Sequence, residues 1–416
     1  MTPPRRRLLV LVPFPPRSDA PHGGARVIAE LLSHLVAKHD VACLYLRSPR
    51  EEAMDEELAR GCALAEEVRR PDGSDSRPAA AFRAARLGSA FVRGRPVWVE
   101  DWNVRAYARR VGALVRTWAP DIVQIEFHVM AQYVRALAGA PAPRVLTVHE
   151  PGADAARDRW SDEAGVRRVL RRADLSAWIR YERERLADVD ALVCFTERDR
   201  NALERLGTTT PIHRIPFGLA VPAVPLDPVG AFPPNLVFVG NFVHPPNVDA
   251  ATRLVRAILP ALEKRHPDIS LSIVGEDPAG RARAFAGGAV TVTGRVDDVT
   301  PYLDRAALVV LPLRLGGGMR VKLLDALAAG KAVVASPLAA EGLDVVDGEH
   351  LRLAESDGEF AAAVDELLGD ETARAGLARR AREWALANAS GGRAAREYAA
   401  LYETLLGKRA SAGQAA

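Results

Sequence analysis

The segment PLRLGGGMRVKLLDALAAG, residues 312–330, carries more information than any other part of this chain. After an apolar strand end it contains three glycines, two cations and a helical pattern, namely Gly316, Gly317, Gly318, Arg320, Lys322 and the helix closed by Gly330. A helix N-terminus behind a glycine loop presents free N–H groups and a positive dipole end, which suits phosphate. Asp325 lies one turn further on, within reach of sugar hydroxyls. The segment therefore predicts a nucleotide-sugar site.

Helical periodicity assigns different directions to these side chains. Lys322 and Asp325 are three residues apart and share one face, while the core face is apolar and consists of Val321, Leu324 and Ala328. In a regular helix Arg320 would point among apolar residues, so we expect it at or before the first turn, reaching into the glycine loop. The alternative is a surface pair between Lys322 and Asp325, worth at most ~0.5 kcal/mol.

Composition limits the class of protein. The 416 residues are 48% hydrophobic and 26% charged, which is typical of a globular protein of two or more domains. A net charge of +3 gives no support for nucleic-acid binding. Cys43, Cys62 and Cys194 form no CxxC motif, and two of them lie in apolar runs, which indicates reduced thiols and a cytoplasmic location.

The N-terminal sequence MTPPRRRLLVLVPFPPR begins with a basic run like that of a secretion signal. Its apolar stretch is short and contains Pro13, so we interpret it as a first β-strand. No apolar stretch approaches the ~20 residues that a membrane-spanning helix needs.

Buried strands and amphipathic helices alternate along the chain, which predicts parallel, doubly wound sheets. The expected strands are Leu8–Val12, Val41–Leu46, Asp121–Glu126, Arg144–Val148, Ala191–Phe195, His213–Ile215, Leu236–Val239, Leu271–Val274, Val290–Val292, Leu308–Pro312 and Ala332–Ala335. The clearest helical patterns are Gly24–Lys38, Val104–Trp118 and Ala164–Asp188, and a last one, Thr372–Leu406, breaks near residues 388–392.

A proline-rich stretch, LAVPAVPLDPVGAFPP at residues 219–234, has no helical period and is interpreted as a linker. We therefore expect one Rossmann-like domain over residues 1–220 and a second over 235–388. A C-terminal helix, residues 389–408, is expected to pack back on the first domain, with Lys408–Ala416 frayed. Ligands of such sheets bind beyond the carboxyl ends of the strands, here in the cleft between the domains.

Two candidate sites follow strands of the first half. Gly23 and Gly24 open a helix after the first strand, where backbone amides can approach a diphosphate, although a tight turn explains them as well. His149 and Glu150 end a strand, and His149 can contact a sugar hydroxyl or move a proton. A hydrogen bond from His149 to a loop carbonyl is the alternative. Glu126, at the end of another strand, is a weaker candidate of the same kind.

Two further candidates lie in the second half. In FVGNFVHPPNVDA, Gly240 permits close approach of a ligand, and Asn241 and Asn247 supply amide donors and acceptors, unless Asn247 caps the next helix. Glu341, in ASPLAAEGLDV, follows a strand and either contacts a sugar or caps a helix. Asp297 and Asp298 precede a helix and are interpreted as a cap rather than a metal ligand.

Residues 235–343, which include FVGNFVHPPNVDA, LSIVGEDP and the opening segment, closely resemble the second domain of the retaining family-4 glycosyltransferases with the GT-B fold. The first half resembles them more loosely, through GGARV, VLTVHE, DALVCFTERDR and IHRIPFG. The resemblance implies a nucleotide-sugar donor held mainly by residues 235–388 and an acceptor held by residues 1–220.

Many members of this family carry two glutamates separated by seven residues. The second contacts the ribose, and Asp325 takes its place here with a side chain one methylene shorter. The first would fall on Gly317, and the arginine that often accompanies it is replaced by Asn241. The diphosphate would then depend on the glycine loop, Arg320 and Lys322, while His149 would contact the donor sugar near its anomeric centre.

The resemblance implies a cytoplasmic bacterial enzyme that transfers a hexosyl group with retention, without a metal or other cofactor. The acceptor hydroxyl would belong to a glycan, a lipid-linked or a small molecule, as in polysaccharide biosynthesis. The basic helix at Val166–Arg185, with Trp178 and Tyr181, suggests contact with the inner face of a membrane, although a solvated face is the commoner outcome for such a helix. The alternatives are a catalytically silent nucleotide-sugar-binding protein and a nucleotide-sugar epimerase of the same architecture.

Overall fold

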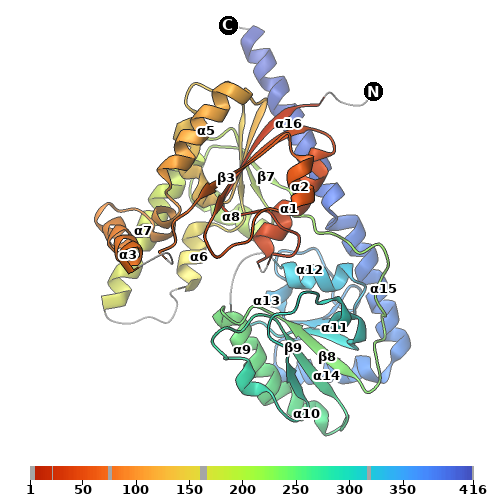
Figure 1. The fold of residues 1–416 in the computed structure, drawn as a ribbon. Helices are drawn as coiled ribbons and strands as arrows, with labels where there is room; N and C mark the ends of the chain where they lie inside the picture. The colour runs from red at the N-terminus through yellow and green to blue at the C-terminus, as the bar shows by residue number, and fades with distance from the viewer. Residues whose placement is uncertain (1–4, 21, 74–76, 160–165, 316–319, 415–416) are drawn as a thin grey trace.

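The structure is a computed structural model that describes residues 5–20, 22–73, 77–159, 166–315 and 320–414. It consists of two α/β units, each built on its own parallel sheet, with the first unit above the second in Figure 1. Each sheet has its own buried hydrophobic core. The prediction of two Rossmann-like domains is thereby confirmed.

The first sheet has seven parallel strands in the order β3-β2-β1-β4-β5-β6-β7. Its central strands are buried along nearly their whole length and are mostly apolar, with Gln124 and Glu126 as buried polar residues of β4, as expected of a parallel sheet that is covered on both faces. Leu8 pairs with Val41 on one side and with Ile122 on the other. The strands are β1 Arg7–Val12, β2 Asp40–Arg47, β3 Leu64–Arg69, β4 Ile122–Glu126, β5 Arg144–Val148, β6 Ala191–Cys194 and β7 Ile212–Arg214.

Helices connect these strands and cover both faces of the sheet (Figure 1). They are α1 Gly23–Val36, α2 Glu56–Gly61, α3 Arg77–Val92, α4 Val97–Asp101, α5 Arg105–Trp118, the 3-10 helix η1 His128–Leu137, α6 Gly152–Arg159, α7 Val166–Leu186 and α8 Glu197–Arg205.

The second sheet has six parallel strands in the order β10-β9-β8-β11-β12-β13. The strands are β8 Asn235–Val239, β9 Ser270–Val274, β10 Val290–Val292, β11 Leu308–Leu311, β12 Val333–Ala335 and β13 Arg352–Leu353. Its helices are α9 Pro245–Arg253, the π-helix η2 Leu254–Ile258, α10 Leu259–Glu263, the 3-10 helix η3 Arg283–Phe285, α11 Thr300–Arg305, α12 Val321–Ala328, α13 Pro337–Ala340, α14 Asp357–Gly369 and α15 Glu371–Asn388.

The chain crosses between the units twice, and the two crossings lie side by side. The Leu219 amide donates to the Ala389 carbonyl at 2.9 Å, and the Gly391 amide donates to the Leu219 carbonyl at 3.3 Å. A Cβ atom on Gly218 would lie 2.3 Å from the Gly391 Cα atom, so a side chain there would separate the crossings.

After the second crossing, α16 (Gly391–Gln414) runs along the first unit, as Figure 1 shows. Its Tyr398 and Tyr402 belong to the first hydrophobic core. Arg6, at the start of the first sheet, forms an ion pair with Glu403 of this helix at 2.8 Å. The end of the chain is therefore part of the packing of the first unit.

The structure also corrects details of the sequence analysis. Strands β3 and β13 were not expected, because the first is an edge strand with a mixed, charged sequence and the second has only two residues. Lys408–Ala416 was expected to be frayed, but α16 continues to Gln414; residues 415–416 lie outside the described part. The helix break near residue 390 is confirmed.

Two other expectations are confirmed. Cys43 and Cys194 are buried free thiols, and Cys62 is free and partly buried. Within the described ranges, no helix combines the length and the apolar character that are needed to cross a bilayer.

Candidate functional site

Two cations, Arg320 and Lys322, lie at the start of α12. Arg320 occupies the N-cap position with backbone angles of −84° and 42°, so it precedes the regular helix as expected. The buried side chains of Val321 and Leu324 anchor the helix in the second core. Burial and the neighbouring Arg320 charge lower the pKa of Lys322 to about 8. Burial also lowers the pKa of Arg320 from its ordinary value.

A neutral amide holds Lys322. Its Nζ atom donates to Asn247 Oδ1 at 2.5 Å, and Asn247 Nδ2 donates to the Asn241 carbonyl at 2.6 Å. Asn241 Nδ2 in turn donates to Glu276 Oε2 at 3.3 Å. Asn247 thus lies within α9 and bridges two elements instead of capping the helix, which makes the capping alternative wrong. The predicted residues Asn241, Asn247 and Lys322 form one connected group.

Gly240 lies at the carboxyl end of β8, where two backbones meet. A Cβ atom on Gly275 would lie 1.9 Å from the Gly240 carbonyl oxygen, and Gly275 has a φ of +136°. Only glycine tolerates both conditions. This contact fixes the loop after β9, which carries Glu276, against the loop after β8, which carries Asn241.

Glu341 joins the two units. Its Oε2 atom accepts from Arg320 at 3.0 Å and from Arg198 of the first unit at 2.6 Å. Glu341 occupies the C-cap position of α13, where its backbone N–H donates to the Leu338 carbonyl, so the capping alternative is confirmed for its backbone. Its carboxylate holds two guanidinium groups next to each other. Close packing accompanies the contact, because a Cβ atom on the next residue, Gly342, would lie 2.6 Å from Thr196 Cγ2.

His149 is buried at the end of β5 and faces a carboxylate rather than a loop carbonyl. Its Nε2 atom lies 2.6 Å from Glu126 Oε2, at the end of the neighbouring strand β4. The ring stacks on Phe127 with centroids 3.8 Å apart, and Phe195 packs edge-on at 4.9 Å. Because Nε2 donates to the carboxylate, Nδ1 is the nitrogen left for other contacts, and it has no hydrogen-bond partner among the described residues.

Residues of α16 complete the surroundings of Glu126. Gln124 Nε2 donates to Glu126 Oε1 at 2.7 Å, and the Thr147 hydroxyl lies 3.2 Å from the same oxygen. Tyr402 donates to Gln124 Oε1 at 3.1 Å, and the hydroxyls of Tyr398 and Thr147 are 3.0 Å apart. The C-terminal helix therefore helps to fix the carboxylate that orients His149.

Gly23 and Gly24 lie where α1 meets the second unit. A Cβ atom on Gly23 would lie 2.6 Å from Cγ2 of Val321, the first residue of α12. A Cβ atom on Gly24 would lie 2.7 Å from Cζ of Phe127, the ring that stacks on His149. The pair is thus required for close packing, which explains the two glycines independently of any ligand.

Asp325 faces the first unit and not Lys322. Both of its carboxylate oxygens accept from Arg26 of α1, each at 2.8 Å. The two side chains are partly exposed, at 34% for Arg26 and 26% for Asp325. The surface pair between Lys322 and Asp325 that was considered from the sequence is therefore wrong, and Asp325 contributes to the contact between the domains.

Three histidines, His22, His149 and His244, lie close enough for their charges to interact. The charges of His149 and of His244, which belongs to the second unit, add to burial in lowering the pKa of His22 to about 4. The His22 ring packs edge-on against Phe14, and its Nδ1 atom accepts from the Ala25 amide at 3.2 Å at the start of α1. Burial and the charge of Lys322 lower the pKa of His244, while the charge of Glu276 raises it.

The structure thus brings together Gly23, Gly24, His149, Gly240, Asn241, Asn247, Arg320, Lys322, Asp325 and Glu341 along the contact between the two units. Gly316, Gly317 and Gly318 lie outside the described residues. The roles of all these residues toward a ligand remain predictions.

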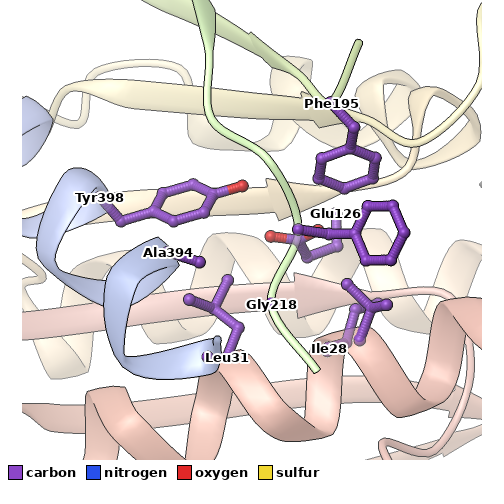
Figure 2. Close-up of a pocket in the computed structure, with 10 residues that line it drawn as sticks. Ile28, Leu31, Glu126, Phe195, Gly218, Ala394 and Tyr398 are labelled. Atoms are coloured by element: carbon purple, nitrogen blue, oxygen red, sulfur yellow. The ribbon is translucent and has the colours of Figure 1, made fainter. Parts of the chain in front are cut away.

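A small pocket lies behind Glu126, at the crossing of the chain (Figure 2). Its walls are mostly apolar and include Ile28, Leu31 and Phe195, with Glu126 and Tyr398 as the polar exceptions. Its accessible volume of about 10 Å³ is the space of a single water molecule. It is too small for a sugar and is not the substrate site.

The two aromatic side chains of α7, Trp178 and Tyr181, face the protein interior. Trp178 is 1% exposed, and Tyr181 donates to the His128 carbonyl at 3.0 Å. Glu182 accepts from the Gly152 and Ala153 amides at the start of α6, and burial raises its pKa to about 7. The two aromatic side chains on which a membrane contact was considered are therefore part of the protein interior.

No group of three or more potential metal ligands occurs among the side chains that the structure describes. Asp298 accepts from the Thr300 amide at 2.8 Å in the turn before α11, whose N-cap residue is Val299, so Asp298 does not cap the helix as expected.

Sequence reasoning missed Arg26, Arg198, His22, His244 and Glu276. Arg26 and Arg198 follow motifs that were noticed, GGARV and TERDR, so a search for cations near those motifs would have found them. His22 precedes the glycine pair and His244 lies between the two asparagines. Glu276 follows a strand in LSIVGEDP, the position at which Glu126 was noticed.

Two family models match the chain, one for each unit. The model described as Glycosyltransferase Family 4 matches residues 21–221. The model described as Glycosyl transferases group 1 matches residues 233–370.

Curated relatives resemble part of the chain. A phosphatidyl-myo-inositol mannosyltransferase of Mycolicibacterium smegmatis is 37% identical over 157 residues, which is 36% of this chain and 40% of that protein. An uncharacterized 44.6 kDa protein in the cps region of Klebsiella pneumoniae is 28% identical over 136 residues, 30% of this chain and 35% of that protein. The matched region thus spans well under half the length of either relative.

Solved structures resemble almost the whole chain. A sucrose-phosphate synthase from Thermosynechococcus elongatus superimposes with a TM-score of 0.70 at 17% identity, covering 97% of this chain and all of that one. HepE from Anabaena, solved with UDP and glucose, gives a TM-score of 0.62 at 12% identity and covers 96% of this chain and all of that one. These likenesses confirm the predicted GT-B fold.

Proposed function

Because the chain carries a family-4 glycosyltransferase domain and a group 1 glycosyltransferase domain, we propose that it transfers a sugar from a nucleotide diphosphate to an acceptor hydroxyl. The donor is held mainly by the second unit and the acceptor by the first. Transfer proceeds with retention at the anomeric carbon. Arg320 and Lys322 supply the positive charge for the leaving diphosphate, so the reaction needs no metal.

The observation that carries this proposal is the excess of positive charge at the start of α12. Arg320 and Arg198 both contact the Glu341 carboxylate, and the Asp199 charge also acts on Arg320. Lys322 contacts the neutral amide of Asn247, so three cations face two carboxylates here. Partly buried cations without a full set of counter-charges are unfavourable, as the lowered pKa of Lys322 indicates. A diphosphate would supply the missing negative charge, at the positive end of the helix dipole.

Glycosyl transfer places charge on the leaving diphosphate as the bond to the anomeric carbon breaks. Cations fixed where that charge develops stabilise the transition state more than the ground state. Neither His149 nor Glu126 is proposed as a nucleophile, because the two side chains are hydrogen-bonded to each other. We therefore propose front-face substitution, in which a leaving-group oxygen takes the acceptor proton.

His149 is proposed to contact the donor sugar through Nδ1, because Nε2 is held by Glu126. Asp325 is proposed to bind the ribose. Arg26 occupies both of its oxygens in this structure, so ribose binding requires at least one of these two hydrogen bonds to be exchanged.

The acceptor is proposed to be a hydroxyl of a glycan, a lipid-linked molecule or a small molecule. The likeness to a phosphatidyl-myo-inositol mannosyltransferase supports a lipid-linked acceptor, and the free thiols support a cytoplasmic location. A peripheral contact would have to use exposed residues such as Val169 and Leu170 at the start of α7, since Trp178 and Tyr181 are buried or internally bonded.

The proposal is tested by incubating the protein with UDP-, GDP- and dTDP-sugars, with and without an acceptor panel. We expect nucleotide release that depends on one donor class and rises with an acceptor, and a product of unchanged anomeric configuration by NMR. Donor binding without turnover on any acceptor would instead identify a silent binding protein. Interconversion of epimeric nucleotide-sugars would identify an epimerase.

The lowered pKa of Lys322 gives nucleotide binding a pH dependence. Burial brings that pKa from 10.5 to about 8, so the free protein loses this proton as the pH rises above about 8. The diphosphate needs the protonated amine, so we expect the Kd of the bound nucleotide to rise by up to ~10-fold per pH unit above that value. Calorimetric titration of UDP, or of whichever nucleotide binds, between pH 7 and 10 measures this change in Kd.

The contribution of Lys322 to folding stability changes with pH in the opposite direction. The folded-state pKa of Lys322 lies below its ordinary value, so the folded protein binds fewer protons between about 8 and 10.5, and this group's contribution to stability rises with pH there. A loss of affinity in this window therefore does not reflect unfolding through Lys322. A Lys322→Gln variant whose affinity kept the same pH dependence would refute the explanation.

The close packing of Gly23 on α12 predicts that Gly23→Ala weakens nucleotide binding. The new methyl group would meet Val321, a stiff β-branched side chain, and would push the domains apart at a cost of ~1–3 kcal/mol in the closed form. Nucleotide titration and small-angle X-ray scattering measure the loss and the opening. Gly88→Ala is the matched control, because a Cβ atom at Gly88 would meet nothing within 4 Å; equal effects of both changes would contradict the prediction.

A further inference from the structure

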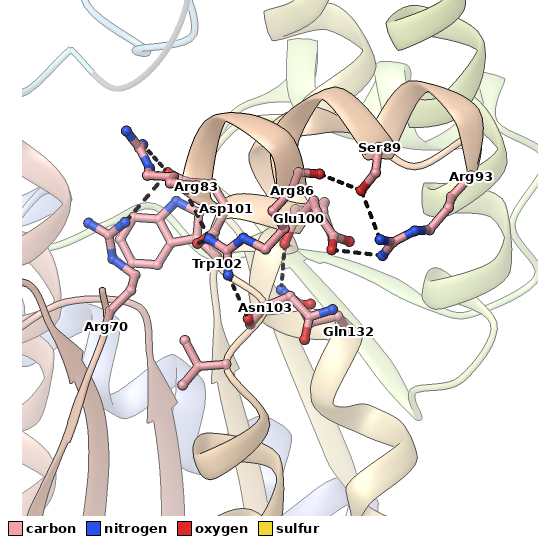
Figure 3. A network of polar contacts seen from close by, with 12 residues as sticks. Arg70, Arg83, Arg86, Ser89, Arg93, Glu100, Asp101, Trp102, Asn103 and Gln132 are labelled. Carbon is pink, nitrogen blue, oxygen red and sulfur yellow. Dashed lines mark hydrogen bonds and ion pairs between the residues drawn. The ribbon is translucent and has the colours of Figure 1, made fainter. Parts of the chain in front are cut away.

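Three arginines of the first unit converge on one carboxylate (Figure 3). Arg83 of α3 donates to both oxygens of Asp101, at 2.8 and 2.6 Å. Arg70, just after β3, approaches the same carboxylate at 3.5 Å, and Arg86 of α3 approaches it at 3.4 Å. We call Arg70, Arg83 and Arg86 the arginine cluster.

The cluster and its surroundings carry more positive than negative charge. The neighbouring Glu100 is 4% exposed and pairs with Arg93 and Arg95, each at 3.2 Å. Asp72 is a further acidic group, and its charge acts on Arg83. Within the arginine cluster, three guanidinium groups thus face the carboxylate of Asp101, with Asp72 as a second acidic group, while Arg93 and Arg95 pair with Glu100. An anion would balance the remainder.

The guanidinium groups are held in fixed positions. Arg70 lies over the Trp102 ring, 4.2 Å from its centroid, and its side chain is 11% exposed. Arg86 donates to the Asn103 and Asp101 carbonyls, each at 3.3 Å. Buried Nε atoms of Arg70 and Arg86 lack hydrogen-bond partners in the described part of the chain. Arg83 is 37% exposed and offers the accessible edge. Planar groups fixed in this way suit the oxygens of a phosphate.

The arginine cluster lies at the same edge of the first sheet as His149. Arg70 follows β3 and His149 follows β5, and the carboxyl ends of parallel strands share one edge. Aromatic contacts connect the two places. Trp102 packs edge-on against Phe14, and Phe14 packs edge-on against Phe127, which stacks on His149.

We propose that the arginine cluster binds a phosphate group of the acceptor, whose hydroxyl then reaches the sugar at His149. The assignment of this phosphate to an acceptor rests on the proposed function, but phosphate binding to the cluster can be measured by itself. A purely structural role, in which Asp101 pins α3 to the sheet, requires only one arginine and does not account for the excess of positive charge.

The test titrates glycerol 1-phosphate, with glycerol as the uncharged control, into the protein saturated with UDP, which fills the donor site. We expect binding of the phosphate only, weakened at least ~10-fold by Arg83→Gln and by Arg86→Gln. Arg93→Gln and Arg95→Gln are matched controls, since they remove the same charge from the same surface without facing Asp101, and they should retain binding. Thermal unfolding identifies any variant that fails to fold, and Arg83→Lys, which keeps the charge, should retain part of the affinity.

Vesicles distinguish a lipid headgroup from a free phosphate. A lipid headgroup is assigned if the protein binds phosphatidylglycerol vesicles but not phosphatidylcholine vesicles. Arg83→Gln should abolish this binding. Binding of glycerol 1-phosphate alone would assign it to a soluble acceptor. No binding in either arm, or equal losses in the Arg93 and Arg95 variants, overturns the proposal. If UDP itself fails to bind, the donor assignment fails separately, and the titration is repeated in Lys322→Ala to exclude phosphate at α12.

Discussion

Lys322→Ala is expected to lower turnover by at least ~10-fold while leaving the fold intact. A hydrogen bond to a charged group contributes ~1.5–3 kcal/mol, and each 1.4 kcal/mol corresponds to a factor of ten in rate. Lys322 contacts the neutral Asn247 and no carboxylate among the described contacts, so its charge is available to a leaving diphosphate. Steady-state kinetics with the accepted donor measures the loss.

The stability of this variant separates a catalytic effect from a structural one. Burial lowers the pKa of Lys322, so the charged amine is less favourable in the folded protein than in the unfolded chain. Its removal should therefore leave the thermal midpoint unchanged or higher. Lys264→Ala, which removes an exposed lysine from the same unit, is the control and should keep full activity. Wild-type turnover in Lys322→Ala would refute the diphosphate assignment.

Glu126→Ala is expected to lower the free energy of unfolding by ~3 kcal/mol and to lower activity as well. The Glu126 carboxylate is 1% exposed and is hydrogen-bonded to His149, Gln124 and the Thr147 hydroxyl. Its removal leaves these buried polar groups without their acceptor and releases the His149 ring. Urea unfolding monitored by circular dichroism measures the loss of stability, and donor kinetics measure the loss of activity.

Glu126→Gln distinguishes the charge of this residue from its shape. The amide oxygen can still accept from His149, so we expect it to recover much of the stability. Glu263→Ala removes an exposed glutamate and should change neither quantity. If Glu126→Ala unfolded at the wild-type urea concentration, the buried hydrogen-bonded group around His149 would not be holding the first domain together.

The fold could be predicted because it follows from local periodicity. Strands such as β6 and β11 are uninterrupted apolar runs, and α5 and α12 have a regular apolar face. The strand β3 was missed because an edge strand exposes alternate charged residues and lacks such a run. The end of α16 was missed because its last residues are small and polar.

The candidate site could be predicted only in part. The position of Arg320 before the first turn of α12 followed from the pattern of the apolar face. The partner of Lys322 is 75 residues away, that of Asp325 is 299 away, and Glu341 meets Arg198 across 143 residues. No spacing within a helix or strand encodes contacts of that length.

The sequence by itself determined two parallel α/β units, the linker between them and the glycine-rich segment at residues 312–330 with its two cations. These features depend on the order of neighbouring residues, which sets helix and strand periodicity. Only the tertiary structure decided that Asp325 faces Arg26, that Asn247 holds Lys322, and that α16 supports Glu126 behind His149. The physical reason is that each of these contacts forms when the packing of two hydrophobic cores brings together side chains that are distant in the chain.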